Sequence, residues 1–295
     1  MKKYKLLIVL VLVLTTLTGC IKRDKMDAIE IKTTVYPIEY LIDNIYGYNS
    51  NIGSIYPNDT VPKEYKITDK KLKEYAKVNM FVYNGLTTEK QIAATLLNEN
   101  NKLKLIDVSQ GLSITHDVEE LWLSPSNYLM LAQNVKNALV DYANSTILKQ
   151  EIEKKYDDLK LIISQFDANF KTTADKSTNK NIIAGNDVFK FLEKYGFTVL
   201  SIEENDTYDA KEYQKAKNLI TQKKNKYIYL LDTEKGKESE NVKKLMSAGA
   251  QVIYINSIET LTDEERANKV TYQTVMNEFI DNIKKETYNS KWKLY

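Results

Sequence analysis

Apolar and polar residues follow two different periods along the chain. From Ile29 onward, short runs rich in β-branched and aromatic residues, typical of strands, alternate with segments whose apolar positions recur every three or four residues, typical of helices. Four strands are predicted in the first part, at residues 29–36, 51–56, 78–83 and 102–108. Helices are predicted between them, beginning near Pro37, Thr68 and Thr88. This alternation predicts a parallel sheet covered by helices on both faces.

The same alternation returns in the second half of the chain. Strands are predicted at residues 181–184, 197–202, 226–231 and 250–255. Helices are predicted after them at residues 187–195, 210–222, 235–247 and 270–284. We therefore expect the α/β class, with two doubly wound parallel-sheet domains. Because ligands of open parallel sheets bind at the carboxyl ends of the strands, the two sets of strand ends are expected to face one cleft.

A long amphipathic segment joins the two halves. Apolar residues recur at helical intervals from about Ser126 to Lys171, and a break at Asn144-Ser145 is left open. Pro125 suits a first helical turn, and serines on either side of it can cap the helix. We predict a spine helix between the domains, with Glu120, just ahead of it, facing the cleft.

The first residues form a targeting segment. Three lysines precede an apolar run at residues 6–14, and residues 17–20 read Leu-Thr-Gly-Cys. This order is typical of a secretory signal peptide, and the apolar run is well short of the ~20 residues that span a bilayer. The ending resembles the bacterial lipobox, which implies cleavage before Cys20 and acylation of its thiol. The predicted organisation is a signal peptide (1–19), a lipidated tether (20–28), an N-terminal domain (29–125), a linking helix (126–173) and a C-terminal domain (174–295).

The composition argues against several functional classes. Cys20 is the only cysteine, so neither a disulfide nor a Cys-rich metal site can form. Removal of residues 1–19 lowers the basic residues from 42 to 39, against 40 acidic ones, and this balance argues against nucleic-acid binding. The chain has no P-loop, no dinucleotide-binding glycine motif and no Gly-x-Ser-x-Gly turn, and its only histidine is His116. We therefore do not expect an enzyme.

Several separated segments resemble one family. They are residues 33–37, 56–65, 81–86, 121–125 (Leu-Trp-Leu-Ser-Pro) and 187–196. In this order they are similar to motifs of the zinc/manganese solute-binding lipoproteins of bacterial ABC importers, and the resemblance covers nearly the whole mature chain. It implies a monomer that is lipid-anchored to the outer face of the bacterial cytoplasmic membrane. It also implies that an ABC permease and its ATPase receive the ligand.

The resemblance also implies where a ligand would bind. The family holds a transition metal with four side chains, usually two histidines, then a histidine or glutamate, and an aspartate. The matching positions here are Lys63, Glu120, Asn186 and Asn256. Glu120 is a competent metal ligand, whereas asparagine offers only a neutral carbonyl. A protonated lysine has no lone pair, and its repulsion of a divalent cation at ~4 Å is about 8 kcal/mol with an effective dielectric constant of 20. We therefore expect no cofactor, and at most weak binding of zinc or manganese.

Alternatives for the cleft stay open. Lys63 and Glu120 could pair directly and lock the cleft without a ligand. The cleft could instead bind a non-metal polar solute, with Tyr36, Tyr65 and Trp122 as aromatic walls. It could also be a decayed, solvated site. Because the family includes adhesins and the chain has 21 tyrosines, a surface adhesion or interaction role with a locked cleft is the alternative function.

The first and fourth ligand positions depend on the register of the resemblance. A slip of one or more residues would bring nearby acids into a metal site, namely Asp59, Glu64, Asp187, Asp232 and Glu234. His116 lies four residues before Glu120 on a polar loop, and we expect it on the surface rather than as a ligand.

Overall fold

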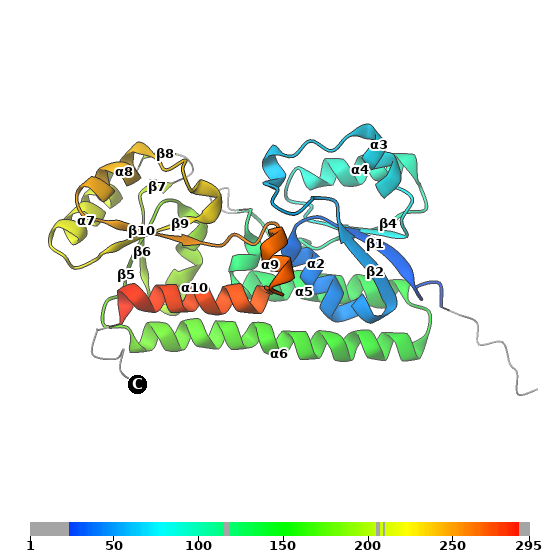
Figure 1. The fold of residues 1–295 in the computed structure, drawn as a ribbon. Coiled ribbons are helices and arrows are strands. Elements are labelled where there is room, and N and C mark those ends of the chain that lie inside the picture. The colour runs from blue at the N-terminus through cyan, green and yellow to red at the C-terminus, as the bar shows by residue number, and fades with distance from the viewer. Residues whose placement is uncertain (1–23, 115–118, 205–206, 209, 289–295) are drawn as a thin grey trace, which may run out of the picture.

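Two sheet-containing domains lie side by side above one long helix (Figure 1). The computed structural model describes residues 24–114, 119–204, 207–208 and 210–288. The first domain has a four-stranded parallel sheet in the order β2-β1-β3-β4, and the second has one in the order β10-β9-β5-β6. The predicted class, two parallel-sheet α/β domains with a long helix, is therefore confirmed.

In the N-terminal sheet, β1 and β3 are the two inner strands. The four strands are β1 (Ile29–Thr33), β2 (Ser50–Ser54), β3 (Met80–Tyr83) and β4 (Lys104–Asp107). Alternate residues Ile29, Ile31 and Thr33 of β1 are buried, as the period of a strand requires. The helices of this domain are α2 (Tyr36–Tyr46), α3 (Asp69–Tyr75) and α4 (Glu89–Glu99). Pro37 lies in the first turn of α2, where its missing N–H costs no hydrogen bond.

The C-terminal domain repeats the plan with some departures from the prediction. Its main strands are β5 (Asn181–Ala184), β6 (Thr198–Ser201), β9 (Tyr227–Leu231) and β10 (Gln251–Ile255). Its helical segments are η4 (Asp187–Tyr195), α7 (Ala210–Thr221), η5 (Asp232–Glu234), α8 (Glu240–Ser247), α9 (Asp263–Ala267) and α10 (Tyr272–Thr287). The segment 187–195 is a 3-10 helix, and α8 begins later than predicted because Gly236 adopts a positive φ of 80° before it. A small antiparallel pair, β7 (Glu203–Glu204) and β8 (Thr207–Tyr208), was not predicted.

The long joining segment is broken at the position that the sequence left open. It forms two helices, α5 (Pro125–Tyr142) and α6 (Thr146–Lys176). The predicted linking helix over 126–173 is therefore divided in two. Asp24 accepts hydrogen bonds from the backbone N–H groups of Asn144 and Ser145 at 2.9 and 2.6 Å, and the Ser145 hydroxyl accepts from Leu148 N–H at 3.4 Å. These polar contacts end one helix and cap the next. The spine is therefore α6 alone, which at 31 residues is about 46 Å long.

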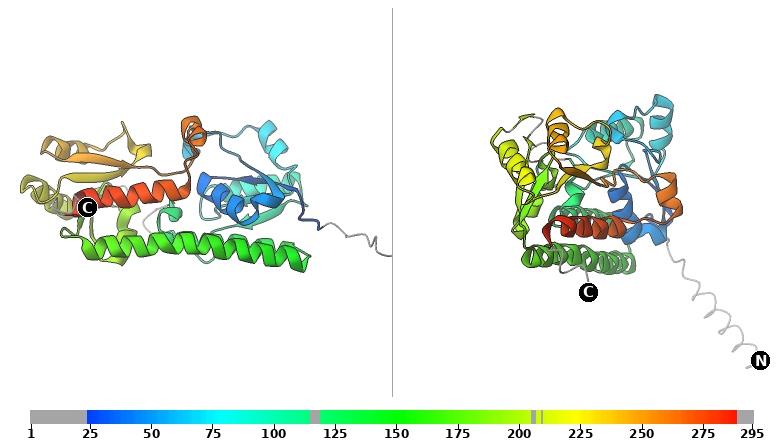
Figure 2. Two further views of the ribbon diagram at one scale, coloured as in Figure 1. Left: turned by 60° about the horizontal axis from the view of Figure 1, so that its bottom comes forward. Right: turned by 60° about the vertical axis from the view of Figure 1, so that its left-hand side comes forward.

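The apolar core passes through the helix layer from one domain to the other. Helix α6 runs beneath both domains, and α2, α5 and α10 pack against it (Figures 1 and 2). One continuous cluster of buried apolar side chains includes residues of both sheets and of these helices. A second, smaller cluster lies between the C-terminal sheet and helices α7 and α8. The two sheets are thus held by a shared helical base.

A second connection crosses between the domains above this base. Residues 256–271, which we call the crossing segment, follow β10 and contain α9 beside α2 (Figure 1). The backbone N–H of Tyr36 donates to the carbonyl of Glu259 at 2.8 Å. Arg266 of α9 donates to both carboxylate oxygens of Glu39 in α2, at 2.9 and 3.0 Å. The crossing segment therefore belongs by sequence to the second domain and by contact to the first.

Candidate solute cleft

A small cavity lies where the strand ends of the first domain meet the crossing segment. Its volume is about 30 Å³. The lining residues that follow β1, β2 and β3 include Val35, Tyr56, Lys63 and Glu89, and the crossing segment adds Glu259. This is the carboxyl edge of the sheet, where ligands of open parallel sheets bind. A volume of this size holds about one water molecule.

Lys63 supplies the positive charge at the mouth of this cavity. It lies in a 3-10 turn, η2 (Pro62–Glu64), and its side chain is 59% exposed. Its ammonium lies 3.3 Å from a carboxylate oxygen of Glu119. Burial opposes the charge of Lys63, but the carboxylates of Glu120, Glu119 and Glu259 outweigh it and raise the pKa of the lysine. Lys63 therefore stays protonated at neutral pH.

Glu120 lies beside this pair rather than in it. It is the N-cap residue of η3 (Leu121–Leu123), which leads directly into α5. Among the ion pairs that the described residues form, with N–O distances up to 4 Å, Lys63 pairs with Glu119. The direct pair with Glu120, which the sequence left open as one alternative, is not formed. Burial raises the pKa of Glu120, while the nearby charge of Lys63 acts in the opposite direction. Lys63 and Glu120 thus interact through space without locking the cleft directly.

Trp122 joins the domains as well as lining the cavity. It is 3% exposed, and its indole N–H donates to the backbone carbonyl of Ser257 at 2.8 Å. Its own carbonyl accepts from the hydroxyl of Tyr272 at 2.7 Å. Only part of its ring therefore remains as a wall. The other two predicted walls make other contacts: the hydroxyl of Tyr36 donates to the carbonyl of Val270 at 3.3 Å, and that of Tyr65 accepts from Lys71 at 2.8 Å. Tyr56, which packs edge-on against Tyr65, is the tyrosine that lines the cavity among the described residues.

Two buried carboxyl groups of the cavity were missed by sequence reasoning. Glu89 and Glu259 are 6% and 7% exposed. Burial raises the pKa of each to about 7; for Glu259 the charge of Glu120 adds to the effect, and for Glu89 a hydrogen bond from Asn84 N–H opposes it. Glu89 opens α4 just after β3, and that position at the carboxyl edge of the sheet could have identified it. No comparable signal existed for Glu259, which reaches the cavity only because of the crossing segment.

The two asparagines at predicted ligand positions are occupied by other contacts. Asn186 caps η4 by accepting from Val188 N–H at 3.1 Å, and its amide donates to Glu234 at 3.1 Å. Glu234 in turn feels the charge of Glu120, which contributes to its raised pKa behind the larger effect of burial. Asn256 is turned toward α9, where its amide donates to Glu265 at 2.7 Å. Asn186 is thus linked to the charges of the cleft only through Glu234, and the amide of Asn256 is bonded to Glu265 outside the cavity lining.

The remaining acids proposed for a slipped register are also engaged. Asp59 accepts from Asp263 N–H at 3.2 Å, Glu64 pairs with Lys237 at 2.8 Å, and Asp187 pairs with Lys190 at 3.0 Å. Asp232 accepts from Ser257 N–H at 2.9 Å. Within the described parts of the chain, no three His, Cys, Asp or Glu side chains converge closely enough to hold a metal ion. His116 and Cys20 lie outside the described residues.

Comparison with known proteins decides the family. Residues 31–286 match the family model described as "Zinc-uptake complex component A periplasmic". The chain belongs to this family. Members of the zinc-uptake family serve as solute-binding components of metal-type ABC transporters, together with a membrane permease and an ATPase.

Individual relatives of the zinc-uptake family are distant in sequence. The chain is 22% identical to the high-affinity zinc uptake system protein ZnuA of Bacillus subtilis over 285 residues, which are 88% of each chain. It is also 22% identical to the zinc-binding lipoprotein AdcA of Streptococcus pneumoniae, of which it spans 61%. The metal-dependent lipoprotein YcdH of B. subtilis shares the fold, with a TM-score of 0.73, 20% identity, and coverage of 88% of this chain and 100% of that one. Across the described residues, no helix combines the length and apolarity needed to cross a bilayer.

Proposed function

We propose that the protein is the solute-binding lipoprotein of a metal-type importer and that its cleft does not bind zinc or manganese tightly. The observation that carries this proposal is the position of the protonated Lys63 ammonium. It lies 3.3 Å from a carboxylate oxygen of Glu119, and the negative charges of Glu120 and Glu259 also raise its pKa. The resemblance assigns Lys63 to the position of the family's first metal ligand. An added divalent cation would have to approach this ammonium, which repels it. Asn186 and Asn256 offer no compensating charge.

The relatives supply the biological setting of the proposal. Their names attribute zinc uptake and zinc binding to them, and we extend to this chain the delivery of a solute to a permease but not the tight binding of the metal. Acylation of Cys20 would hold the mature protein, as a monomer, on the outer face of the membrane. The short tether of residues 20–28 would then position the cleft near the permease.

The small cavity favours a cleft that is closed in this conformation. A volume of about 30 Å³ has no room for an organic solute. The crossing segment adds to this closure by carrying Glu259 into the cavity. A ligand-free cleft in which Lys63 is the one cation among the described lining residues therefore fits the geometry better than a cleft filled by a polar solute.

Isothermal titration calorimetry with zinc and manganese tests the proposal. The unmodified mature protein should bind neither metal better than micromolar. Lys63→Met should strengthen zinc binding, because Glu119, Glu120 and Glu259 would lose the cation that they now share. Lys237→Met is the matched control: it removes one exposed lysine that pairs with the neighbouring Glu64 and leaves the cavity unchanged.

The outcomes separate the alternatives. Nanomolar zinc binding by the unmodified protein would refute the proposal outright. An equal response of Lys63→Met and Lys237→Met would show that the position of Lys63 has no special importance. Native mass spectrometry of protein purified without chelator would reveal an organic passenger, if the cleft takes one in an open conformation.

A further inference from the structure

The first described residues are fastened to the body of the protein. The carboxylate of Asp24 accepts a hydrogen bond from the backbone N–H of Met26 at 3.0 Å. It also accepts from the N–H groups of Asn144 and Ser145, which lie between α5 and α6. Met26 is fully buried, and its carbonyl accepts from the hydroxyl of Tyr46. From Asp24 onward, the predicted tether is therefore held by the fold.

This attachment limits the distance between the fold and a lipid on Cys20. Four Cα–Cα steps of about 3.8 Å separate Cys20 from Asp24, so the two Cα atoms lie within about 15 Å of each other whatever path the chain takes. Acyl chains on Cys20 would lie in the bilayer. The membrane surface would then lie close to the end of the molecule that carries Asp24, and this step rests on the lipid anchor in the proposed function.

An exposed isoleucine lies at the same end. Ile147 is in the first turn of α6, two residues after the Ser145 N–H that bonds to Asp24. It is 72% exposed, the largest fraction among the large apolar residues that the structure describes. The described chain begins beside the start of α6, at one end of the molecule (Figure 1). Ile147 and the anchor therefore share this end.

A tyrosine and a lysine lie next to this end as well. Tyr48 is 49% exposed and belongs to η1 (Gly47–Asn49). The side chain of Asn49 accepts from the N–H of Ala28 at 3.4 Å, which places η1 against the first residues of the described chain. The ammonium of Lys155 lies 6.0 Å from the centre of the Tyr48 ring. Tyrosine and lysine are typical of the boundary between a membrane and water.

The sequence around Asp24 adds positive charge. Lys22 and Arg23 precede Asp24, and the exposed Lys25 follows it. The carboxylate of Glu151, next to Tyr48, offsets one of these charges. Basic residues are attracted to anionic headgroups within about 10 Å, so the short reach of the anchor brings them into range.

We propose that this end of the molecule rests on the phospholipid headgroups of the bilayer that holds Cys20. We call the contacting side chains the end surface; they are Lys25, Tyr48, Ile147 and Lys155. Ile147 enters the boundary of the acyl chains, Tyr48 lies at the level of the headgroups, and the lysines face anionic phosphates. Helix α6 then leads away from the membrane.

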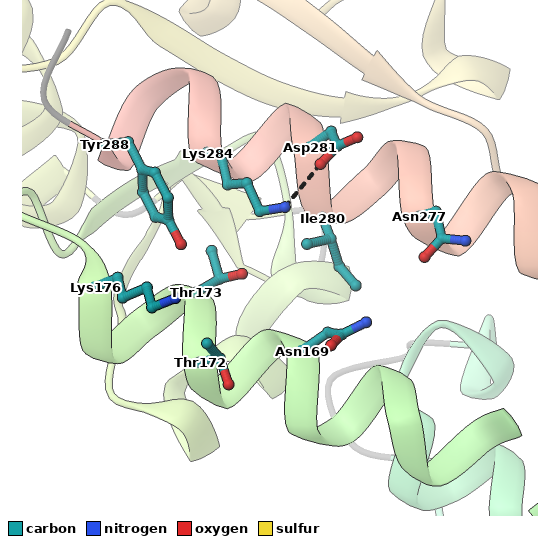
Figure 3. Close-up of a pocket in the computed structure, with 9 residues that line it drawn as sticks. All are labelled: Asn169, Thr172, Thr173, Lys176, Asn277, Ile280, Asp281, Lys284 and Tyr288. Carbon is teal, nitrogen blue, oxygen red and sulfur yellow. Dashed lines mark hydrogen bonds and ion pairs between the residues drawn. The ribbon is translucent and has the colours of Figure 1, made fainter. Parts of the chain in front are cut away.

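The far end of α6 provides a comparison position. A groove of about 590 Å³ lies there, between the last two turns of α6 and the C-terminal half of α10 (Figure 3). Its floor includes Ile280, which is 3% exposed, and on its rim Lys284 donates to Asp281 at 2.8 Å. Thr172 stands on the rim contributed by α6 and is exposed. It lies on the same face of α6 as Ile147, about 38 Å farther along the helix.

Quenching by labelled lipids tests the proposal. Cys20 is the only cysteine and its thiol would be acylated, so Ile147→Cys and Thr172→Cys each add one free thiol for a fluorophore. The lipidated protein is reconstituted in vesicles of phosphatidylglycerol and phosphatidylcholine with nitroxide-labelled headgroups, and circular dichroism checks that each variant is folded. The fluorophore at position 147 should be quenched several-fold more than the one at 172. Leu161→Cys, at a position that is 71% exposed and about 21 Å from Ile147 along α6, should give an intermediate value.

Three results would overturn the proposal. Equal quenching at positions 147 and 172 in the acylated protein would show that the molecule does not stand on this end. No quenching at any of the three positions, with the protein still bound to the vesicles, would show that its body is held clear of the headgroups. An intact mass without acyl chains would refute the lipid anchor in the proposed function and this inference with it.

Discussion

The cleft and the groove differ in what fills them. The cleft lies at the carboxyl edge of the first sheet, is rich in charge and encloses about 30 Å³. The groove lies on the helical base, exposes little unpaired charge and offers about 590 Å³. The larger hollow is therefore not the one to which the family resemblance assigns a ligand.

Cavity volume and the family resemblance therefore point to different places in this fold. In the cleft, side chains of the protein already occupy the space, and Lys63 supplies the cation beside Glu119. In the groove, the walls are complete but the described residues leave the space between them open. The cleft should therefore respond to changes of charge, whereas the groove should respond to changes of shape.

Placing histidine at the two positions that the resemblance assigns to metal ligands should have the largest effect. Lys63→His together with Glu120→His removes the repelling ammonium and adds two nitrogen donors near Glu119 and Glu259. Zinc affinity should rise at least a thousandfold, which corresponds to about 4 kcal/mol. Calorimetry measures the change, and Lys237→His with Glu64→His serves as the control pair outside the cavity. An unchanged affinity would mean that positions 63 and 120 do not converge on one ion.

The next effect should appear in the pH dependence of stability. Burial, with the charge of Glu120, raises the pKa of Glu259 from 4.5 to about 7. The folded state therefore holds a proton that the unfolded state has lost between these pH values, so stability falls as the pH rises through this window and levels off above it. Glu259→Gln removes this loss and should stabilise the protein at pH 8 by up to about 3 kcal/mol, with little change at pH 5.

Urea unfolding at the two pH values measures this effect. The exposed Glu264→Gln, on the same crossing segment, is the matched control and should change stability little at either pH. A gain for Glu259→Gln that is equal at pH 5 and pH 8 would contradict a charge-based origin. It would indicate a packing effect instead.

A smaller effect is expected where the crossing segment is fastened to the first domain. Arg266 makes two parallel hydrogen bonds to Glu39 and a third to Asn58. Arg266→Lys keeps the charge but loses this forked geometry, and should lower the free energy of unfolding by roughly 1 kcal/mol. A double-mutant cycle with Glu39→Gln isolates the coupling between the two side chains. A coupling energy near zero would show that the pair does not fasten the segment.

Most of the fold could be predicted from the sequence because its signals are local. The eight main strands lie within the predicted ranges or within a residue of them, since β-branched runs and flanking polar turns mark them clearly. The nine-residue segment 187–195 differs: its apolar spacing predicts a helix but cannot tell a 3-10 from an α-helix. The break before α6 depends on Asp24, which is about 120 residues away in sequence, so a local pattern could only leave it open.

The cleft could be predicted only in part because its contacts are not local. The resemblance identified positions 63 and 120, but the choice of Glu119 over Glu120 as the partner of Lys63 depends on the backbone path into η3. Glu259 is buried only because the crossing segment returns to the first domain. Similarly, Trp122 was predicted as a wall, whereas its hydrogen bond to Ser257 also makes it a link between the domains.

The continuous core has a consequence for how the chain can be divided. Buried side chains of both sheets join through α2, α5, α6 and α10 into one cluster, so each sheet relies on helices contributed from the other half of the sequence. Helix α10, the last of the chain, completes the base on which the first domain also rests. Neither half of the sequence therefore supplies every helix of this shared core, so a cut between the two sheets would expose apolar surface on both fragments.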